Sequence, residues 1–408
     1  MRRLIVLAVI GILLAGIGTL SVLGGLLIPR RRRAAGKPAD ILMTGSFHSN
    51  NWIASHLGPL ARAQSCGRLR VVSTFPIAPM DKLELVVPPA TLRRLAGDTG
   101  ARLLTFFWEG IRRRPDYVAG FHLLINGLLA QLLARITGAR SMYFCVGGPA
   151  EVLGGGINSE NRLFERLGTP SVSVERALLR AVRRFDLIIT MGSRARTFFQ
   201  EAGVRCAIHV VSGGIDASRY QPATEPPDAD MIFVGRLVPI KRVDLLLECV
   251  RIVATSRPDV RLVVVGDGPL RHELEDQANR LGIQSNVHFA GQQSDMPAWL
   301  RRARLFMLTS DSEGLSLALM EAMLCGLPAI VSDVGDLGDL VQSGANGYLV
   351  PGRSAAPFAE RVLQVLQDSG ELSRLARNAR DSALKHELGE CSKLWDTVLS
   401  QDHDRCAE

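Results

Sequence analysis

Several features that mark common functional classes are scarce or absent in this sequence of 408 residues. Aromatic residues make up only 5% of the chain, and no basic stripe with interleaved aromatics occurs, so we expect no nucleic-acid partner. No segment is of low complexity, and no repeat of solenoid period is present. The chain is instead long enough for two globular domains of ordinary size.

Disulfide and metal-binding patterns are missing as well. The seven cysteines are scattered without any C-x-x-C spacing, which favours reduced thiols. No cluster of His, Cys and Asp has metal-ligand spacing, so we expect no metal cofactor. The D-x-D pattern of Asp228 and Asp230 lies in a proline-rich stretch before a predicted strand, where we expect both carboxylates to be solvated.

The net charge of +8 is concentrated at the N-terminus. Residues 1–39 contain seven basic residues and no acidic one, so the rest of the chain is close to neutral. The seven are Arg2, Arg3, Arg30, Arg31, Arg32, Arg33 and Lys37. Between them, Leu4 to Ile28 carries no charge and is long enough to cross a bilayer as a helix.

We therefore expect a transmembrane anchor and basic linker over residues 1–37. A cleaved signal peptide is the competing interpretation, but the apolar run is long for one, and arginines follow it where small residues are expected. The heavier arginine cluster lies after the span. The positive-inside rule then predicts a single-pass protein of the inner (cytoplasmic) membrane, with its globular part in the cytoplasm.

After the linker, continuous apolar runs alternate with amphipathic stretches, as expected for strands buried on both faces. The first series of predicted strands is Asp40–Met43, Leu69–Ser73, Leu83–Val87, Leu103–Phe107, Tyr117–Gly120, Met142–Cys145, Leu187–Thr190 and His209–Val211. The second series is Met231–Val234, Leu262–Val265, Val287–Phe289, Leu305–Leu308, Ala329–Ser332 and Tyr348–Val350. Helices are predicted between them, for example at Val243–Thr255, Leu270–Leu281 and Leu317–Leu324. This alternation predicts an α/β chain with two Rossmann-like domains, each a parallel sheet covered by helices.

The proline-rich segment Gln221–Asp230 separates the two series. We expect an N-terminal domain over residues 38–220, a C-terminal domain over 221–375 and a helical segment over 376–408. Ligands of such folds bind outside the carboxyl ends of the strands, so residues that follow the strands are the site candidates.

Cations and carboxylates follow two strands of the second series. Arg236 and Lys241 come after Met231–Val234, and two cations at one strand end suit a diphosphate. Glu313 follows Leu305–Leu308 in the loop before a predicted helix. A pair of surface cations and an acidic helix N-terminus are the plain alternatives.

The predicted helix after Glu313 adds two features. The amides of Gly314, Leu315, Ser316 and Leu317 would be free at its N-terminus, ready to hold phosphate oxygens. Glu321 lies inside the same, otherwise apolar helix, where the helix dipole does not explain it. Its carboxylate can accept from both hydroxyls of a ribose.

Together with the turn Cys325-Gly326-Leu327-Pro328 and the segment Gly344–Pro351, these residues resemble the family 4 glycosyltransferases of the GT-B fold. Order and spacing match throughout residues 231–351. The resemblance implies that Arg236 and Lys241 hold the diphosphate of a nucleotide-sugar donor, that Glu313 contacts the donor sugar and that Glu321 binds the ribose. It also implies retention of anomeric configuration without a metal. Ser316 departs from the family, in which many members have glycine at that position.

The N-terminal half resembles the family more loosely. Thr44-Gly45-Ser46 ends the first strand, where the family has a glycine-containing loop that faces the donor phosphates. The strand Tyr117–Gly120 leads to His122, a candidate for contact with the donor sugar or the acceptor, or else a structural histidine. Glu313 and His122 are the catalytic candidates, and Gly45 joins the donor-binding set.

The resemblance predicts a retaining hexosyl- or N-acetylhexosaminyl-transferase that moves a sugar from a nucleotide diphosphate to a hydroxyl. The anchor favours a lipid-linked or polysaccharide acceptor of the cell envelope. A sugar-nucleotide epimerase of the same fold is an alternative, although it would need neither acceptor nor anchor. A non-catalytic scaffold is a second one, but it would have no need of the intact pairs of cations and glutamates.

Overall fold

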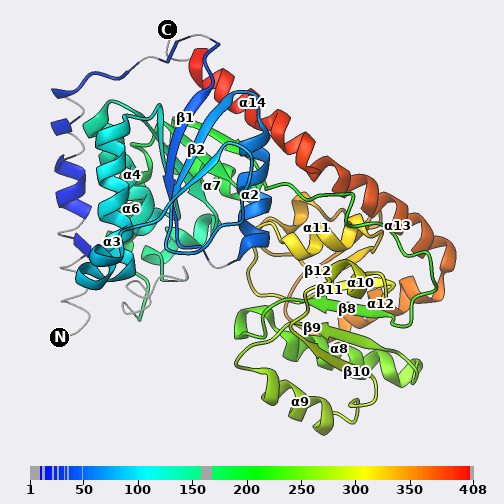
Figure 1. The fold of residues 1–408 in the computed structure, drawn as a ribbon. Coiled ribbons are helices and arrows are strands. Elements are labelled where there is room, and N and C mark those ends of the chain that lie inside the picture. Colours follow the sequence, from blue (N-terminus) through cyan, green and yellow to red (C-terminus); the bar gives the residue numbers. More distant parts are fainter. Residues whose placement is uncertain are drawn as a thin grey trace. The chain divides into compact units, whose positions relative to one another are not determined.

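A computed structural model of the chain describes residues 10–11, 14–20, 23–24, 27–31, 33–34, 36–47, 49–157 and 168–404. The chain divides into two compact units. The first comprises Met1–Gly214 and Leu388–Glu408, and the second comprises Ile215–Glu387. Each unit consists of a sheet with helices packed around it (Figure 1), as the sequence predicts.

The described residues of the first unit form a seven-stranded sheet in the order β3-β2-β1-β4-β5-β6-β7. Its strands are β1 (Ala39–Thr44), β2 (Cys66–Val72), β3 (Leu83–Val86), β4 (Tyr117–Phe121), β5 (Arg140–Cys145), β6 (Leu187–Thr190) and β7 (Ala207–Val210). Its helices include α2 (Asn50–Arg62), α3 (Ala90–Arg113), α4 (Leu128–Thr137), α6 (Val172–Val182), α7 (Ser193–Glu201) and α14 (Leu388–Asp404). Neighbouring strands all pair in parallel, so their carboxyl ends share one edge of the sheet.

One predicted strand of this unit is wrong. Leu103–Phe107 lies inside α3, which bends at Gly97, where the backbone is left-handed. The buried residues of the second half of α3 recur at helical spacing, namely Ala101, Arg102, Thr105, Phe106, Glu109 and Gly110. A short apolar run does not by itself distinguish a strand from a buried helix, and the helical period becomes visible only over the longer segment.

The second unit contains a six-stranded parallel sheet in the order β10-β9-β8-β11-β12-β13. The strands are β8 (Met231–Val234), β9 (Leu262–Val265), β10 (Val287–Gly291), β11 (Leu305–Leu308), β12 (Ala329–Ser332) and β13 (Gly347–Val350). The helices are α8 (Val243–Ser256), α9 (Arg271–Arg280), α10 (Met296–Leu300), α11 (Leu317–Leu324), α12 (Ala355–Gln367) and α13 (Ser369–Ala383). The predicted helix Leu317–Leu324 has the bounds of α11.

The chain crosses between the units twice, at Gly214 and at Leu388. Composition predicts a boundary at residues 220 and 221 and a separate segment over 376–408. In the structure α13 ends in the second unit, whereas α14 packs on α2 of the first. Trp395 of α14 is buried with its ring 5.7 Å from that of Phe144, and Asp396 accepts from Ser65 N at 2.7 Å. The difference arises because the packing of α14 depends on residues far away in the sequence.

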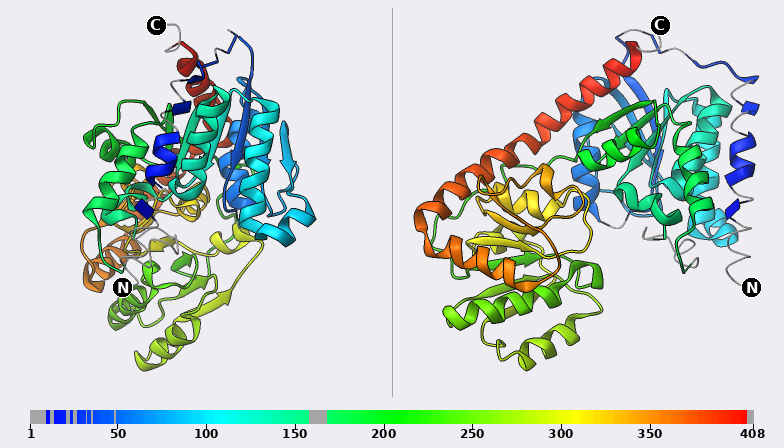
Figure 2. Two further views of the ribbon diagram at one scale, coloured as in Figure 1. Left: turned by 90° about the vertical axis from the view of Figure 1, so that its left-hand side faces the viewer. Right: turned by 180° about the vertical axis from the view of Figure 1, so that it is seen from behind.

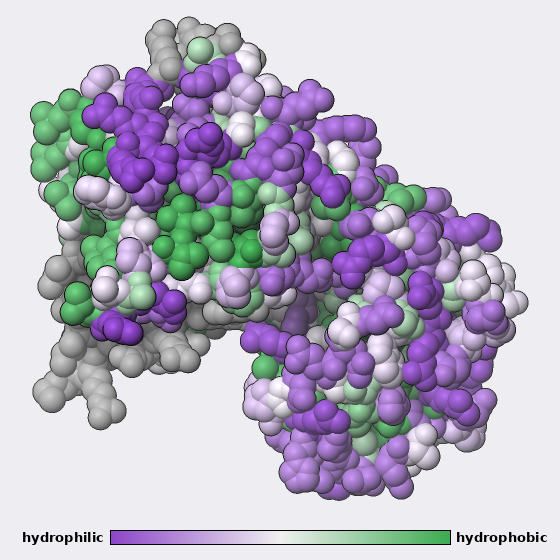
Figure 3. All heavy atoms as spheres, viewed as in Figure 1, coloured by the Kyte–Doolittle hydropathy of each residue, from purple (hydrophilic) through white to green (hydrophobic). Residues whose placement is uncertain are grey.

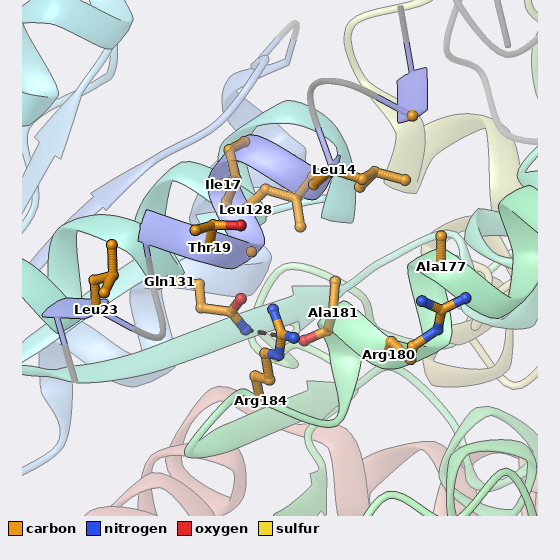
Figure 4. Close-up of a pocket in the computed structure, with 13 residues that line it drawn as sticks. Leu14, Ile17, Thr19, Leu23, Leu128, Gln131, Ala177, Arg180, Ala181 and Arg184 are labelled. Carbon is orange, nitrogen blue, oxygen red and sulfur yellow. Dashed lines mark hydrogen bonds between the residues drawn. The ribbon is translucent and has the colours of Figure 1, made fainter. Parts of the chain in front are cut away.

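The apolar N-terminal run is described in part. Ile10 is buried in a cluster with Leu123 and Leu128, and Leu14 packs against the same cluster. Figure 4 shows a pocket between this segment and helices α4 and α6, with Gln131, Arg180 and Arg184 among its lining residues.

Among the described residues, no helix has the length and apolar composition needed to cross a membrane. Residues 4–9, 12, 13, 21, 22, 25 and 26 of the predicted span Leu4–Ile28 lie outside the described part of the chain. The span therefore stays a prediction.

Two loops of the second unit meet at a glycine. Gly335 follows β12 with φ of 53°, and a Cβ added there would lie 1.6 Å from the carbonyl oxygen of Glu313. No side chain fits such an approach, and the backbone conformation also favours glycine. The backbone of Gly335 thus sets the position of Glu313 in the loop after β11.

Gly335→Ala should lower the free energy of unfolding of the second unit by about 2–4 kcal/mol, because backbone strain and a steric clash add. Gly344→Ala is the matched control, since Gly344 has φ of 78° but no atom within 4 Å of an added Cβ. Strain alone should cost that variant about 1 kcal/mol. Urea unfolding measures the free energy of unfolding of both variants. Equal losses would show that the close approach to Glu313 does not add to the cost of Gly335→Ala.

Candidate active site

The site candidates of the second unit lie where the strand order reverses. From β8 the chain continues outward to β9 and β10, and then returns to β11 on the other side of β8. The loops that follow β8 and β11 therefore lead away from each other at the carboxyl edge of the sheet. Ligands of open α/β sheets bind at this place. Arg236 and Lys241 lie in the first loop, and Glu313 lies in the second.

Two predicted site residues form an ion pair. Lys241 Nζ lies 2.6 Å from Glu313 Oε1, and Ser310 Oγ donates to the same carboxylate oxygen at 2.6 Å. The side chains of Lys241 and Glu313 are 21% and 8% exposed. At this burial, solvent screens the pair only in part. The pair holds one positive and one negative charge at the carboxyl edge of the sheet.

Contacts that the sequence did not reveal hold the two loops together. Asp311 N donates to Ile240 O at 2.8 Å, and Thr309 Oγ1 donates to Arg242 O at 2.8 Å. Arg242 also reaches Asp311, with its Nη1 3.4 Å from Asp311 Oδ1. Arg242 and Asp311 are charged residues close in sequence to Lys241 and Glu313, respectively. No local pattern predicted that Arg242 and Asp311 form an ion pair with each other. These contacts fix the spacing between Lys241 and Glu313.

The N-terminus of α11 adjoins Glu313. Ser316 is the N-cap, and its Oγ accepts from Leu319 N at 3.3 Å. None of the described residues accepts a hydrogen bond from the amides of Gly314, Leu315 or Ser316, and Leu317 is the first residue of the helix. These half-buried amides and the helix dipole favour an anion at this position. The hydroxyl that departs from the family pattern therefore caps the helix.

Two further predicted donor residues have different environments. Arg236 is exposed in the loop after β8. Glu321 is buried in α11, at 4% exposure, and hydrogen-bonds the Tyr220 side chain. Burial, followed by the charge and hydrogen bond of Glu321, raises the pKa of Tyr220. Tyr220 thus positions the Glu321 carboxylate, and the proposed contact of Glu321 with a ribose stays a prediction.

In the first unit, Gly45 and His122 follow the neighbouring strands β1 and β4. Gly45 is buried, and an added Cβ would lie 2.8 Å from the Phe47 ring. Its lack of a side chain therefore has a packing explanation. Its predicted contact with donor phosphates is untested by this geometry.

A buried arginine connects the two loops that carry Gly45 and His122. Arg102 Nη1 donates to Thr44 Oγ1 at 2.6 Å and to Asn126 Oδ1 at 2.8 Å. Asn126 Nδ2 in turn donates to Phe121 O at 2.8 Å, directly before His122. Burial lowers the pKa of Arg102 to about 10. Sequence reasoning missed Arg102 because the stretch around it was assigned to a strand.

His122 is held by a buried carboxylate that the sequence did not reveal. His122 has φ of 62°, and its Nδ1 lies 3.1 Å from Glu151 Oε1. Glu151 also accepts from Leu123 N and Gly147 N, both at 2.7 Å, and from Tyr143 Oη at 2.8 Å. The histidine side chain itself is 41% exposed. Glu151 thus fixes the orientation of an accessible imidazole.

The electrostatics of Glu151 agree with this arrangement. Burial by itself would raise the pKa of Glu151, but the charge and hydrogen bond of His122 and the amides of Gly147 and Leu123 bring that pKa below its usual value. The carboxylate is accordingly ionised at neutral pH and attracts a proton on Nδ1. Glu151 lies 29 residues from His122, and a lone glutamate in a glycine-rich segment gave no signal for the pairing.

The D-x-D pair is engaged by protein donors. Asp228 Oδ2 lies 2.7 Å from Arg302 Nη2, and Asp230 Oδ2 accepts from Arg261 N at 3.0 Å. The hydrogen bond and charge of Arg302 lower the pKa of Asp228 against the opposing effect of burial. The two carboxylates therefore serve different local contacts.

The structure brings together Lys241, Glu313 and the N-terminus of α11 in the second unit. It brings Gly45 and His122 to adjacent strand ends in the first unit. Arg236 lies in the loop of Lys241, and Glu321 lies about one turn into α11. Each unit thus contributes its own group of polar residues at the carboxyl edge of a parallel sheet.

Sequence comparison relates the chain to known sugar-transferring proteins. It is 32% identical over 223 residues to the D-inositol 3-phosphate glycosyltransferase of Streptomyces bingchenggensis, covering 49% of this chain and 48% of that protein. It is 24% identical over 241 residues to the lipopolysaccharide core biosynthesis mannosyltransferase LpsB of Rhizobium meliloti, covering 53% and 67%. The match to the Streptomyces protein therefore spans about half the length of that protein.

Solved structures with the same architecture extend over more of the chain. Anabaena Alr3699/HepE in complex with UDP-glucose aligns with a TM-score of 0.67 at 18% identity, covering 89% of this chain and 100% of that one. S. aureus TarM aligns with a TM-score of 0.60 at 17% identity, covering 74% and 58%. At these identities the likeness concerns the fold, which is GT-B with two parallel Rossmann-like sheets.

The second unit carries the family relationship. Residues 215–382 match the model of the family described as glycosyl transferases group 1, and this range is almost the whole of that unit. It contains both loops with Lys241 and Glu313, and the helix α11 between Glu313 and the following strand. By this match, the second unit belongs to the glycosyl transferases group 1 family.

Proposed function

We propose that this chain transfers a sugar from a nucleoside diphosphate to a hydroxyl group with retention of anomeric configuration. The observation that carries the proposal is the group of Lys241, Glu313 and the α11 amides at the strand-order reversal of the second unit. A cation, a carboxylate and helix amides at this place suit a diphosphate linked to a polyhydroxylated sugar. Membership of the second unit in the group 1 family supports the same reaction.

In the proposed reaction the bond between the anomeric carbon and the diphosphate oxygen breaks, and a bond to the acceptor oxygen forms. The acceptor hydroxyl passes its proton to an oxygen of the departing diphosphate, which gains negative charge as the bond to the sugar breaks. Lys241, Arg236 and the amides of Gly314 and Leu315 would stabilise that charge. Glu313 would contact the donor sugar and Glu321 the ribose, as the family resemblance implies.

A uridine nucleotide is the first donor to test, because the Alr3699/HepE structure of the same fold is a complex with UDP-glucose. A hexosyl or N-acetylhexosaminyl group is the proposed cargo. For the acceptor we propose a lipid-linked sugar or a polysaccharide of the cell envelope. Support comes from the relative LpsB, whose name refers to lipopolysaccharide core biosynthesis, and from the uncharged run Leu4–Ile28.

We also propose that the chain is attached to the inner membrane with both units in the cytoplasm. The support is the arginine run after the apolar segment. In the structure Arg30 donates to Asp186 and to Ala139 O, and Arg31 N donates to Gly138 O at 2.8 Å. The basic linker therefore binds to the first unit instead of acting as a free tether.

Lys241→Ala should weaken the binding of UDP by about 1.5–3 kcal/mol, because a charge-assisted contact is lost. Glu313→Gln should instead strengthen the binding of UDP. Removing a carboxylate beside the diphosphate relieves a repulsion of about 1–2 kcal/mol at the dielectric of a partly exposed site, while sugar transfer falls. Isothermal titration calorimetry of both variants gives the test.

Lys385→Ala, an exposed lysine of the same unit, is the matched control and should bind UDP as the unchanged protein does. Unchanged affinity in Lys241→Ala would remove Lys241 from the nucleotide site. A loss of affinity in Glu313→Gln would mean that the carboxylate accepts from the ligand instead of repelling it.

Glu151→Gln should lower kcat by about 10- to 100-fold, because the imidazole of His122 loses the charged group that orients it. UDP affinity at the second unit should be unchanged. Glu175→Gln is the matched control, since Glu175 also accepts from a loop glycine, Gly154 N at 2.7 Å, without contacting a histidine. Equal kcat values for the two variants, at equal melting temperatures, would assign Glu151 to the loop structure alone.

Protease treatment of spheroplasts should leave both units intact if they lie in the cytoplasm, and lysis should make them cleavable. The expectation follows from the position of Arg30, Arg31, Arg32 and Arg33 after the apolar run. A periplasmic marker digested in the same sample serves as control. Cleavage of the units in intact spheroplasts would reverse the proposed orientation and separate the site from cytoplasmic nucleotide sugars.

A further inference from the structure

The second half of α3 has an apolar outer face. Its inner face packs on the first sheet through Phe106 and its neighbours, but Leu104, Trp108 and Ile111 are 54%, 63% and 46% exposed. Their spacing of four and three residues places them in one stripe along the helix. A surface helix normally shows charged or polar residues on that face, so a stripe of three large apolar side chains indicates a contact surface.

All charge at the surface of this stretch is positive. Every exposed residue from 104 to 114 is apolar or an arginine, the arginines being Arg112, Arg113 and Arg114. The acidic residue of the stretch, Glu109, is buried and pairs with Arg113 at 3.2 Å. A tryptophan and leucines followed by arginines are typical of helices that lie at a bilayer surface with anionic headgroups.

The apolar N-terminal segment ends beside the same arginines. Arg31 donates through Nη1 to Arg114 O, which directly follows α3. Ile28, the last residue of the uncharged run, is three residues away and thus within about 10 Å along the chain. Described residues of the run also present apolar side chains outward, with Leu20, Leu23 and Leu27 exposed.

These elements lie on one side of the first unit. In the left view of Figure 2 the N-terminal segment, α4 and α3 run next to one another. Figure 3 shows apolar residues gathered at the visible surface of the first unit, whereas the visible surface of the second is mostly hydrophilic. The N-terminal segment and α3 therefore lie on one side of the first unit, and both carry exposed apolar side chains.

We propose that the second half of α3 lies in the headgroup layer of an anionic membrane, with Leu104, Trp108 and Ile111 buried among the upper acyl chains. The three arginines then contact lipid phosphates. A second copy of this chain is a poorer occupant, because two such faces would bring like charges together. The proposal rests on the proposed membrane location, and it makes α3 a second contact with the bilayer that orients the first unit.

The test uses the full chain reconstituted in phosphatidylcholine vesicles with about one third phosphatidylglycerol. Lipids brominated near the headgroup should quench Trp108, because bromine quenches tryptophan within contact range. Trp108→Phe should remove the quenched component. The other three tryptophans have protein partners or are buried: Trp395 is buried, Trp52 stacks on His56, and Trp299 stacks with Arg302 in the second unit. The remaining emission should therefore change little.

Leu104→Ser with Ile111→Ser should abolish the quenching of Trp108. Arg112→Gln should reduce the anionic-lipid dependence of the quenching about fivefold, the factor that corresponds to one arginine at a membrane surface. Leu394→Ser, an exposed leucine of α14, is the matched control and should leave the quenching unchanged. UDP binding should be the same in all variants, which separates this proposal from the proposed function.

Equal quenching in the unchanged protein and in Trp108→Phe would overturn the proposal. A detergent-solubilised chain that is a dimer, and becomes a monomer in the Leu104→Ser and Ile111→Ser variant, would also overturn it, since a second copy would then cover the stripe. If the unchanged chain does not bind UDP, that result contradicts the proposed function and leaves the proposal on α3 unaffected.

Discussion

Neighbouring strands of both sheets run parallel, and this arrangement decides where chemistry is possible. A parallel strand begins at the same edge as its neighbour, so loops that carry side chains from distant parts of the sequence meet at the opposite edge. In the second unit β8 and β11 are neighbours, although 70 residues lie between them in the sequence. Their pairing brings Lys241 to Glu313, and the glycine contact at Gly335 fixes the carboxylate side. The same rule places Gly45 and His122 at adjacent strand ends of the first unit.

The two units hold their charged residues in different ways. In the second unit Lys241 and Glu313 neutralise each other at a partly open edge. In the first unit, Glu151 is buried and ionised, and it is held by amides, a phenol and a histidine. Lys241 can exchange its contact with Glu313 for a contact with a ligand, because water and ligand reach this pair. The arrangement around Glu151 is rigid, since each hydrogen bond would have to be lost in an apolar surrounding.

Much of the fold could be predicted because buried parallel strands are continuous apolar runs. The helix α11 was bounded correctly because its apolar run lies between the loop with Glu313 and the turn Cys325-Gly326. The residues at the strand ends followed from the same pattern. The Lys241–Glu313 contact did not, because the helices and strands between the two residues decide it. The contacts of Glu151 and Tyr220 were not predicted for the same reason, since each acts on a residue distant in sequence. Leu103–Phe107 shows the converse failure, in which a local apolar run was given too much weight.

The position of α14 has a consequence for how this chain is made. The first unit is complete only when α14 covers α2 and buries Trp395. Those residues leave the ribosome only after the whole of the second unit. During synthesis the second unit is therefore available as an uninterrupted folding domain, whereas the first must wait with its α14-binding surface uncovered. In the growing chain, the second unit can therefore fold before the first unit is complete. Until α14 is synthesised, the apolar surface that it later covers stays exposed, and such surface is a binding site for chaperones.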